Sequence, residues 1–510
     1  MLVPFTVNDF LERGSLVYGE RVGVIDEPDQ PATSLGELTY DQIAARARAM
    51  ALAMERLGIG EGDRVAMVSH NSARLLTAFF GICGYGRILV PINFRLSRDE
   101  VAYIVEHSGA RVLFVDPEVA DTLAGIECEH TFVIGADEHL FAEGGEPTPW
   151  SAPDENATAT INYTSGTTAR PKGVQLTHRN LWVNAMMQAV HLGVSDRDVY
   201  LHVLPMFHCN GWGMPFVCAG LGVPQIVLRK VDGAEILRRV QEHGVTIMCG
   251  APAVVASVLD AAEAWDGPVP GRDRLRIIVA GAPPPTRTIV RVQQELGWEF
   301  IQIYGLTETA PLLTVNRVRS EWDELAPQER AAKLVRAGAP AIGVRLSIDA
   351  EGEVLARSNV CLDGYWENPQ ESARCLAGGW FHTGDGGGLD ETGYLTISDR
   401  RKDVIITGGE NVSSIEVEDA LFGHPAVAEV AVIGVPDQKW GETIKALVVL
   451  REGASVTEAE LIEHCKSRVA RYKAPSSVEY RDTLARTATG KLQKFILRAP
   501  YWEGRERQVN

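Results

Sequence analysis

The sequence predicts an α/β fold, and two observations support this prediction. Helix-like and strand-like patterns alternate along the 510 residues, which favours helices layered on sheets. Residues 401–510 have a strand and helix pattern of their own, which predicts a small second domain after a large one at residues 1–400. The length is enough for about three or four structural units.

In the first part of the chain, the best-defined helix follows a capping box. Thr39 and Gln42 have the spacing of this motif, apolar residues recur at helical intervals after them, and Gly58 ends the pattern. Runs of apolar residues predict buried strands over residues 64–69 and 111–115.

Two further predicted strands, at residues 276–280 and 299–303, end in segments that carry glycine, proline and polar residues. Ligands of α/β sheets bind at the carboxyl ends of strands, so these two ends are candidate binding segments. The acidic stretch 137–156, which is rich in glycine and proline, is predicted to be a surface connection.

The C-terminal part has its own elements. Residues 427–435 and 445–450 are predicted strands, and a capping box at Thr457 and Glu460 begins a helix. Charged residues interrupt the apolar pattern at 399–402, which sets the expected domain boundary.

Composition excludes several classes of protein. The chain has 49 Lys and Arg against 67 Asp and Glu, a net charge of −18, which argues against nucleic acid or an anionic membrane as a partner. The eight cysteines are scattered without a Cys-x-x-Cys pair, as expected for reduced thiols. No apolar run reaches the roughly 18 residues of a membrane span, and the N-terminus lacks a signal-peptide pattern. We therefore expect a cytoplasmic protein.

The most informative stretch is residues 163–174, Tyr-Thr-Ser-Gly-Thr-Thr-Ala-Arg-Pro-Lys-Gly-Val. It follows a predicted strand and combines hydroxyls, glycines and the ammonium group of Lys172. Such a loop can bind a polyphosphate through backbone N–H groups, hydroxyls and the ammonium. The Gly-x4-Gly-Lys-Ser/Thr spacing of the common nucleotide loop is absent.

Two more motifs combine groups that suit a nucleotide. In residues 304–311, Tyr304 can stack on a purine, while Thr307 and Glu308 can meet phosphate and Mg²⁺; a strand with a surface glutamate is the plain alternative. In residues 379–385, Asp385 either accepts two ribose hydroxyls or bonds its own backbone in a turn.

The last two motifs lie near the C-terminus. A solvated charge run explains Arg400 to Asp403, but not the Gly-Gly-Glu-Asn that follows at 408–411. In residues 486–494, Lys491 is either an exposed tail lysine or a mobile cation that stabilises a phosphate oxygen.

In this order and at these spacings, the five motifs resemble the adenylate-forming superfamily from near Thr39 to about Arg498. The Gly-Gly-Glu-Asn-Val-Ser-Ser and Thr-Ala-Thr-Gly-Lys-Leu-Gln-Lys segments resemble its acyl-CoA synthetase branch. The resemblance implies a large N-terminal domain of several subdomains with layered α/β sheets, and a small mobile α+β C-terminal lid. It also implies two half-reactions: a carboxylate and ATP give acyl-adenylate and pyrophosphate, and the CoA thiol then displaces AMP.

The resemblance also implies roles for single residues of the nucleotide site. The β- and γ-phosphates are assigned to Thr164, Ser165, Gly166, Thr167, Thr168 and Lys172. Adenine is assigned to Gly281, Ala282 and Pro283, with Tyr304 stacked on it, and the α-phosphate to Thr307. Mg²⁺ is assigned to Glu308 and Thr168, and the ribose to Asp385 and Arg400.

Further implied roles concern the transfer to CoA. Lys491 is implied to bridge the carboxylate and the α-phosphate, and Lys402 to be the hinge about which the lid turns. Gly408 and Gly409 are implied to line a pantetheine tunnel, where side chains would block close approach. The CoA nucleotide is assigned to Trp440, Arg471 and Lys473. No cysteine is needed as a nucleophile, because positioning and charge neutralisation suffice.

Two residues depart from the family pattern. Ala169 stands where glycine, or sometimes serine, is usual, and a left-handed backbone there would strain it by roughly 1–2 kcal/mol. Ala485 replaces the proline that usually precedes the lysine loop. Both changes fall on parts used for adenylation. One alternative is therefore an enzyme that only transfers a preformed acyl-adenylate, made by a separate adenylating enzyme, to CoA.

Two other functions stay open at this point. An acyl-AMP ligase would pass the acyl group to a separate carrier protein, since no carrier domain follows Asn510. A non-catalytic acyl-nucleotide binder would need neither Glu308 nor Lys491, so their presence argues against it. The sequence leaves open whether the protein is a homodimer.

Residues 204–216 resemble the acyl-pocket segment of the family. Phe207, His208 and Trp212 are aromatic, and Gly211 and Gly213 are expected to leave space between them. Gly305, Leu306, Leu312 and Leu313 are expected to add wall, with His208 as a gate for the carboxylate. These residues predict a bulky hydrophobic monocarboxylic acid as substrate; an aromatic turn in the core is the plain alternative.

Overall fold

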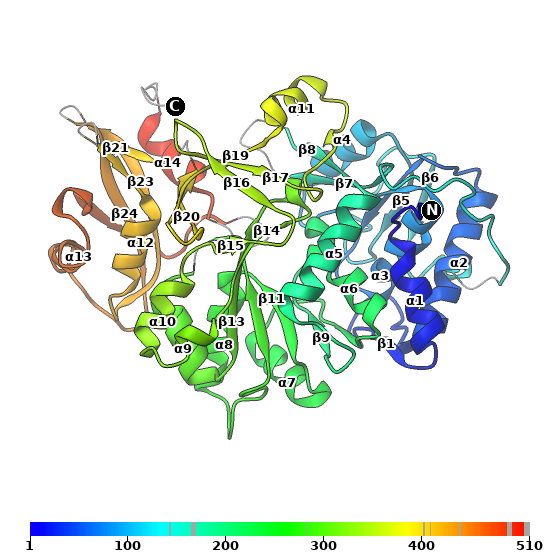
Figure 1. The fold of residues 1–510 in the computed structure, drawn as a ribbon, viewed down its shortest axis with the longest axis horizontal. Helices are drawn as coiled ribbons and strands as arrows, with labels where there is room; N and C mark the ends of the chain where they lie inside the picture. The colour runs from blue at the N-terminus through cyan, green and yellow to red at the C-terminus, as the bar shows by residue number, and fades with distance from the viewer. Residues whose placement is uncertain are drawn as a thin grey trace.

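The computed structural model describes residues 1–141, 144–164, 170–282, 284–400, 403–407, 410–437, 440–486 and 492–503. It has the predicted α/β architecture, with a large N-terminal domain and a smaller C-terminal domain (Figure 1). The smaller domain, orange and red in Figure 1, lies at the opposite end of the long axis from the N-terminus.

The first sheet has seven strands and contains both sides of the predicted phosphate loop. Its inner strands are parallel, whereas β7 and β8 form an antiparallel pair. In spatial order the strands are β18 (Gly364–Tyr365), β8 (Lys172–Thr177), β7 (Thr158–Thr164), β4 (Ile88–Ile92), β3 (Arg64–Val68), β5 (Ala110–Val115) and β6 (His130–Val133).

The second sheet has nine strands, with a parallel centre and antiparallel edges. In order they are β15 (Ala339–Pro340), β14 (Leu312–Asn316), β13 (Glu299–Gly305), β12 (Arg276–Val279), β11 (Ile247–Gly250), β9 (Tyr200–His202), β10 (Gln225–Val227), β1 (Val22–Ile25) and β2 (Glu37–Thr39). Neighbouring β12 and β13 are parallel, so their carboxyl ends lie at the same edge.

Helices fill the space between these two sheets and cover their outer faces. One hydrophobic core joins both sheets through α2, α3, α5 and α6, which contribute residues such as Met50, Phe79, Leu181 and Phe216. The helices of this domain are α1 (Asn8–Tyr18), α2 (Tyr40–Arg56), α3 (Ala73–Gly81), α4 (Arg98–Ser108), α5 (His178–Leu192), α6 (Met214–Leu221), α7 (Gly233–His243), α8 (Pro252–Glu263), α9 (Thr286–Arg291), α10 (Pro327–Leu334) and α11 (Pro369–Cys375).

A third, antiparallel sheet of four strands follows in the chain and lies between the large body and the C-terminal domain (Figure 1). Its strands are β16 (Arg345–Ile348), β17 (Glu353–Arg357), β19 (Phe381–Leu389) and β20 (Leu395–Arg400).

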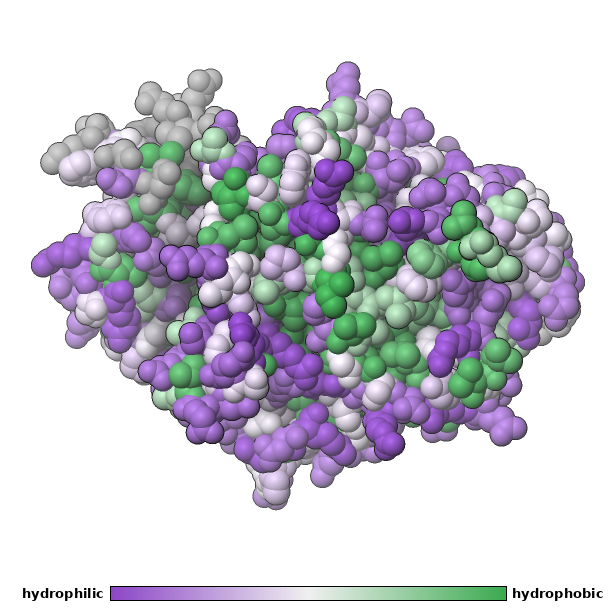
Figure 2. Space-filling view, in the orientation of Figure 1, coloured by the Kyte–Doolittle hydropathy of each residue, from purple (hydrophilic) through white to green (hydrophobic). Residues whose placement is uncertain are grey.

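Figure 2 shows hydrophobic residues gathered in the middle of the face it displays, with hydrophilic residues around its outer edges.

The C-terminal domain has its own sheet and its own core. Its strands are β21 (Ile405–Thr407), β22 (Glu410–Val412), β23 (Val427–Asp437), β24 (Gly441–Leu450) and β25 (Ser477–Tyr480), and its helices are α12 (Ser414–Phe422), α13 (Glu458–Lys466) and α14 (Lys494–Trp502). Val417, Val432, Ile444 and Leu461 are buried in this core.

The structure confirms the elements predicted from the sequence patterns. Thr39 and Thr457 form reciprocal capping boxes at α2 and α13. The predicted strands correspond to β3, β5, β12, β13, β23 and β24. The stretch 137–156 contains one short 3₁₀ helix at Glu138–Phe141, where Glu138 bonds Arg46 and Arg74. Among the described residues no helix is both long and apolar enough to cross a bilayer.

A buried ion pair connects the first two sheets. Arg229, just after β10, donates to both carboxylate oxygens of Asp116, just after β5, at 2.9 and 2.6 Å. The two side chains are only 4% and 2% exposed. Removal of one partner of such a pair leaves a buried charge without compensation.

We expect Arg229→Met to lower the free energy of unfolding by about 3–5 kcal/mol, because it leaves the Asp116 carboxylate buried and unpaired. Chemical denaturation of the full chain measures this loss. Lys230→Met is the matched control. Lys230, the next residue, forms an ion pair with Glu118, but its side chain is 72% exposed, so a loss below about 1 kcal/mol is expected. Equal losses in the two variants would contradict the assignment.

Candidate nucleotide and acyl site

The predicted phosphate loop connects two antiparallel strands, β7 and β8. Thr164 ends β7 and lies opposite Lys172, the first residue of β8. Ser165, Gly166, Thr167 and Thr168, with Ala169, lie outside the described residues. The described ends therefore bring Thr164 and Lys172 together at the base of the loop.

The ammonium group of Lys172 has a partner that the sequence patterns did not reveal. Its Nζ lies 2.5 Å from Oε1 of Glu371, which is in the first turn of α11. Hydrogen bonds from Arg374 and then from Lys172 lower the pKa of Glu371 to about 2, although burial opposes them. The Glu371 carboxylate is therefore ionised at neutral pH, and the contribution of this lowered pKa to stability is lost as the pH falls through it.

Glu308, the predicted Mg²⁺ ligand, lies in a 3₁₀ turn directly after β13, together with Thr307. The hydroxyl of Tyr365 donates to its Oε1 at 3.0 Å. Burial, and after it the Glu308 carboxylate, raise the pKa of Tyr365, so this hydroxyl keeps its proton. A carboxylate held by one donor at the end of a strand suits a hard cation bound together with substrate phosphates.

Tyr304 and Asp385 are brought together from separate sheets. The Tyr304 hydroxyl, at the end of β13, donates to Oδ2 of Asp385 on β19 at 2.8 Å. Asp385 is 7% exposed and lies opposite Arg400 in the β19–β20 pairing. The residues predicted for adenine and ribose are thus neighbours in space.

The predicted adenine segment begins beside Tyr304. Gly281 and Ala282 follow β12 and are exposed, and β12 runs parallel to β13, whose end carries Tyr304. Pro283 lies outside the described residues. This is the edge of the sheet where α/β proteins bind ligands.

The predicted acyl-pocket segment has an unusual backbone. Residues 209–212 have φ of 45°, 52°, 57° and 59°, a left-handed turn in which three of the four residues are not glycine. Such residues cost roughly 1–2 kcal/mol each and persist only where surrounding contacts hold them. Here Asn210 bonds Thr160 and Asn162, and the Trp212 carbonyl accepts from Asn184 at 3.1 Å.

The two glycines of this segment do not leave space for a ligand, contrary to the sequence-based expectation. Both have positive φ, 57° for Gly211 and 82° for Gly213. A Cβ on Gly213 would lie 2.5 Å from Nδ2 of Asn184, and one on Gly211 would lie 3.3 Å from Cδ of Pro215. These glycines permit the left-handed turn; a side chain at Gly213 would overlap Asn184, and one at Gly211 would make a tight contact with Pro215.

The other predicted acyl-site residues lie close to the same turn in the fold. Phe207 is 7% exposed and packs edge-on against Phe94, while His208 is half-buried. Leu312 and Leu313 are fully buried in β14, and Leu306 is half-buried. A Cβ on Gly305 would lie 1.5 Å from the Pro311 carbonyl oxygen, so only glycine fits there.

Of the residues predicted for CoA, three are described. Trp440 is 47% exposed, Arg471 is exposed, and Lys473 donates to both carboxylate oxygens of Glu416 at 2.9 and 2.6 Å. The hinge residue Lys402, the tunnel residues Gly408 and Gly409, and Lys491 lie outside the described residues.

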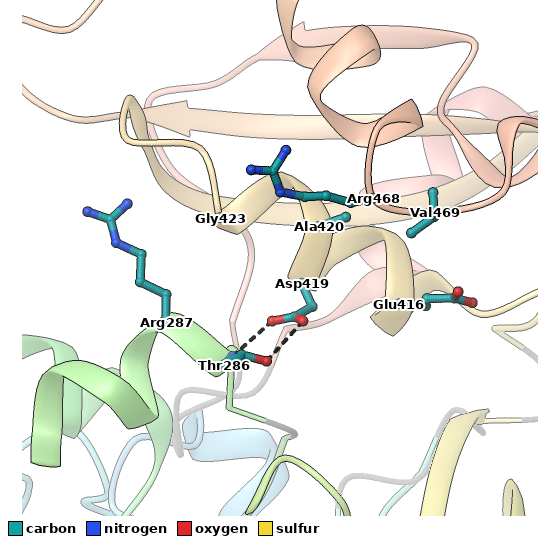
Figure 3. Close-up of a pocket in the computed structure, with 8 residues that line it drawn as sticks. All are labelled: Thr286, Arg287, Glu416, Asp419, Ala420, Gly423, Arg468 and Val469. Carbon is teal, nitrogen blue, oxygen red and sulfur yellow. Dashed lines mark hydrogen bonds between the residues drawn. The ribbon is translucent and has the colours of Figure 1, made fainter. Parts of the chain in front are cut away.

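The C-terminal domain also contacts the large domain away from these residues. Asp419 on α12 accepts hydrogen bonds from the backbone N–H and the hydroxyl of Thr286, the first residue of α9, at 2.9 and 3.2 Å (Figure 3). Beside this contact lies a cavity of about 380 Å³, into whose rim Arg287 and Arg468 extend from opposite domains. None of the residues that line it was predicted from the sequence.

Comparison with known families decides the assignment. The model of the AMP-binding enzyme family matches residues 20–366, and the model of the AMP-binding enzyme C-terminal domain matches residues 416–491. The chain belongs to this family. It is an adenylate-forming enzyme of the acyl-CoA synthetase branch, an acid–thiol ligase.

Several relatives of this adenylate-forming enzyme are CoA ligases. A 4-hydroxybutyrate–CoA ligase from Metallosphaera sedula is 36% identical, with 96% of this chain and 93% of the relative covered. A 2-methylpropanoate–CoA ligase from Humulus lupulus is also 36% identical, with 97% and 95% covered. A peroxisomal acetate/butyrate–CoA ligase from Arabidopsis thaliana is 34% identical, with 96% and 93% covered.

Solved structures of the superfamily have the same fold. An anthranilate CoA ligase in complex with anthranoyl-AMP superposes with a TM-score of 0.87 at 28% identity, covering 98% of each chain. The o-succinylbenzoate CoA synthetase of Bacillus subtilis, in complex with its acyl-adenylate, gives 0.83 at 29% identity, covering 98% of this chain and 99% of its own.

We expect Lys172→Met to lower acid-dependent ATP–pyrophosphate exchange about 100-fold, because it removes the cation at the base of the phosphate loop. Thioester formation from a preformed acyl-adenylate, which carries no pyrophosphate, should change by less than about threefold. Arg374→Met is the matched control, since Arg374 pairs with the same Glu371 but is 76% exposed. An equal loss in both half-reactions would contradict a phosphate-specific role.

Proposed function

We propose that the chain is an ATP-, Mg²⁺- and CoA-dependent acyl-CoA synthetase that works through an acyl-adenylate. The observation that carries this proposal is the hydrogen bond between Tyr304 and Asp385. It brings the residues assigned to adenine and ribose within one site, with Glu308 one short turn further along the chain. Both ATP with magnesium and acyl-adenylates are present in solved relatives.

The chemistry then follows from position and charge. The substrate carboxylate attacks the α-phosphorus in line. The Thr307 hydroxyl donates a hydrogen bond to the α-phosphate, and the Lys491 ammonium offsets the charge that develops on its oxygens. Glu308 and Thr168 would hold Mg²⁺, which would supply positive charge for the phosphate groups of ATP. Pyrophosphate leaves along the loop that contains Thr164 and Lys172. The sulfur of the CoA thiol then attacks the acyl carbon and forms the thioester bond, the bond from the acyl carbon to the phosphate oxygen breaks, AMP leaves, and the thiol proton is released to solvent.

We also propose the domain division of the sequence analysis: residues 1–400 bind nucleotide and acid, and residues 401–510 form a lid that turns about Lys402. The separate sheet and core from β21 onward support this division. After the turn, Gly408 and Gly409 would line the pantetheine path, with Trp440, Arg471 and Lys473 nearest the CoA nucleotide. Trp440 and Arg471 are exposed, as an incoming ligand requires.

For the acid, we propose a short or branched apolar monocarboxylate. The buried side chains of Phe207, Trp212 and Leu312 supply an apolar wall. Protein atoms lie close to Gly211 and Gly213, the glycines that suggested extra space for the acid. Relatives at 34–36% identity act on 2-methylpropanoate and on acetate or butyrate. The bulky hydrophobic acid expected from the sequence is the competing prediction. The solved anthranilate CoA ligase, which binds an aromatic acyl-adenylate, supports it.

A paired assay on one panel of acids tests the function. One arm follows acid-dependent ATP–pyrophosphate exchange, and the other supplies synthetic acyl-adenylate with CoA or with a carrier protein and follows the thioester. Activity in both arms with CoA supports a complete synthetase. Thioester without exchange identifies the half-enzyme, transfer only to the carrier identifies an acyl-AMP ligase, and inactivity in both arms identifies a binder.

Ala169 supplies a direct prediction on adenylation. A decrease of about 1.4 kcal/mol in the activation free energy raises a rate tenfold. If the Ala169 methyl group strains the loop by that amount, Ala169→Gly should raise ATP–pyrophosphate exchange about tenfold. Thioester formation from preformed acyl-adenylate should stay unchanged, because that step does not use the phosphate loop. Ala485→Pro is the control for the lysine loop. An unchanged exchange rate in Ala169→Gly would show that the methyl group does not limit adenylation.

The size of the acyl wall supplies a second prediction. Trp212→Leu should raise kcat/KM for octanoate and benzoate relative to butyrate by about tenfold or more, because one methylene in an apolar pocket changes discrimination by about 10–200-fold. Trp265→Leu is the matched control, since Trp265 follows α8 and packs against a separate apolar cluster that includes Val258 and Trp298. If wild-type enzyme already prefers octanoate over butyrate, the bulky-acid prediction holds instead.

A further inference from the structure

A buried carboxylate lies directly behind the segment that presents Asp385. Glu353, the first residue of β17, is 7% exposed and pairs with Gly386 across the β17–β19 ladder. Its Oε1 accepts the backbone N–H of Gly384 at 2.8 Å, and its Oε2 lies 3.1 Å from Nδ1 of His382. Both oxygens thus hold residues just before Asp385.

The same segment is held from a second direction. The hydroxyl of Thr383 donates to the Val354 carbonyl at 2.7 Å and accepts the backbone N–H of Asp385 at 3.1 Å. Between these contacts Gly384 has a φ of 72°, a left-handed conformation that only glycine adopts without strain. The orientation of the Asp385 carboxylate therefore depends on the two peptide groups that Glu353 and Thr383 hold.

We propose that Glu353 is a positioning residue for the nucleotide ribose: through Gly384 and His382 it holds Asp385 in the orientation that accepts the ribose hydroxyls. This inference rests on the proposed role of Asp385 in nucleotide binding. A hydrogen bond to a charged acceptor is stronger than a neutral one, so a buried glutamate suits the task.

A metal role for the same residues is the competing explanation. Ligand atoms of Asp349, Glu353 and His382 lie within 4.8 Å of one another. However, Oδ1 of Asp349 already accepts the backbone N–H groups of Glu351 and Glu353 at 2.9 and 2.8 Å. With both Glu353 oxygens also engaged, this arrangement favours a network that fixes the backbone.

The test compares AMP with 2′,3′-dideoxy-AMP, which lacks the ribose hydroxyls, by calorimetric titration of the full chain. Glu353→Ala should weaken AMP binding about tenfold or more and dideoxy-AMP binding less than about twofold. Glu353→Gln should stay within about threefold of wild type, because its amide oxygen can still accept from Gly384. Glu351→Gln, a change at an exposed residue of the same turn, is the matched control.

Several outcomes would overturn the inference. They are an equal loss for both nucleotides in Glu353→Ala, no loss for either, or a wild-type protein that binds AMP and dideoxy-AMP equally. A rise in Tm on adding Zn²⁺ or Mn²⁺ to wild type that disappears in Glu353→Ala would support the metal explanation instead. If Glu353→Ala does not fold, Glu353→Met, which keeps the side-chain length but cannot accept from Gly384, gives the same AMP comparison. Wild type that prefers AMP but forms no thioester from any acid would overturn the proposed function, not the role of Glu353.

Discussion

The site depends on one hydrogen bond between two sheets that are distant in the chain. The Tyr304 hydroxyl reaches Asp385 across 81 positions of sequence, and each partner is fixed by its own surroundings. Tyr304 ends a strand inside the nine-stranded sheet, and Asp385 lies on β19, behind which Glu353 and Thr383 hold the backbone. The hydrogen bond thus joins two residues that we propose for the nucleotide, one from each sheet.

The charged side chains Lys172 and Glu308 already have protein partners, which a bound ligand would have to displace. Lys172 is held by Glu371, and Glu308 by Tyr365, although the phosphate and Mg²⁺ assigned to them compete for the same atoms. For Lys172, exchange of one charged partner for another is less costly than creation of an unpaired charge, whereas Glu308 has a hydrogen bond from the neutral Tyr365 hydroxyl. Away from these pairs, the contact from Asp419 to Thr286 joins the C-terminal domain to the large domain.

The sequence by itself determined the fold class, the capped helices α2 and α13, and the order of the nucleotide motifs. Local patterns encode these features: capping boxes lie within four residues, and strand ends show as a change from apolar residues to glycine, proline and hydroxyls. The family resemblance then assigned Tyr304, Glu308, Asp385 and Lys172 to one site, and the structure brings Tyr304 and Asp385 into contact.

Only the tertiary structure decided which partners hold these residues and what the glycines of the acyl segment are for. Glu371, Tyr365 and Glu353 lie 199, 57 and 31 positions from the groups they hold, Lys172, Glu308 and Gly384, so no local pattern could reveal them. Gly213 lacks a side chain, which suggested open space in a pocket. Its positive φ and the nearby Asn184 amide show instead that it belongs to a closely packed turn. The physical reason is that side-chain pairing and free volume depend on where distant backbone segments meet, whereas helices, strands and caps depend on neighbours in the chain.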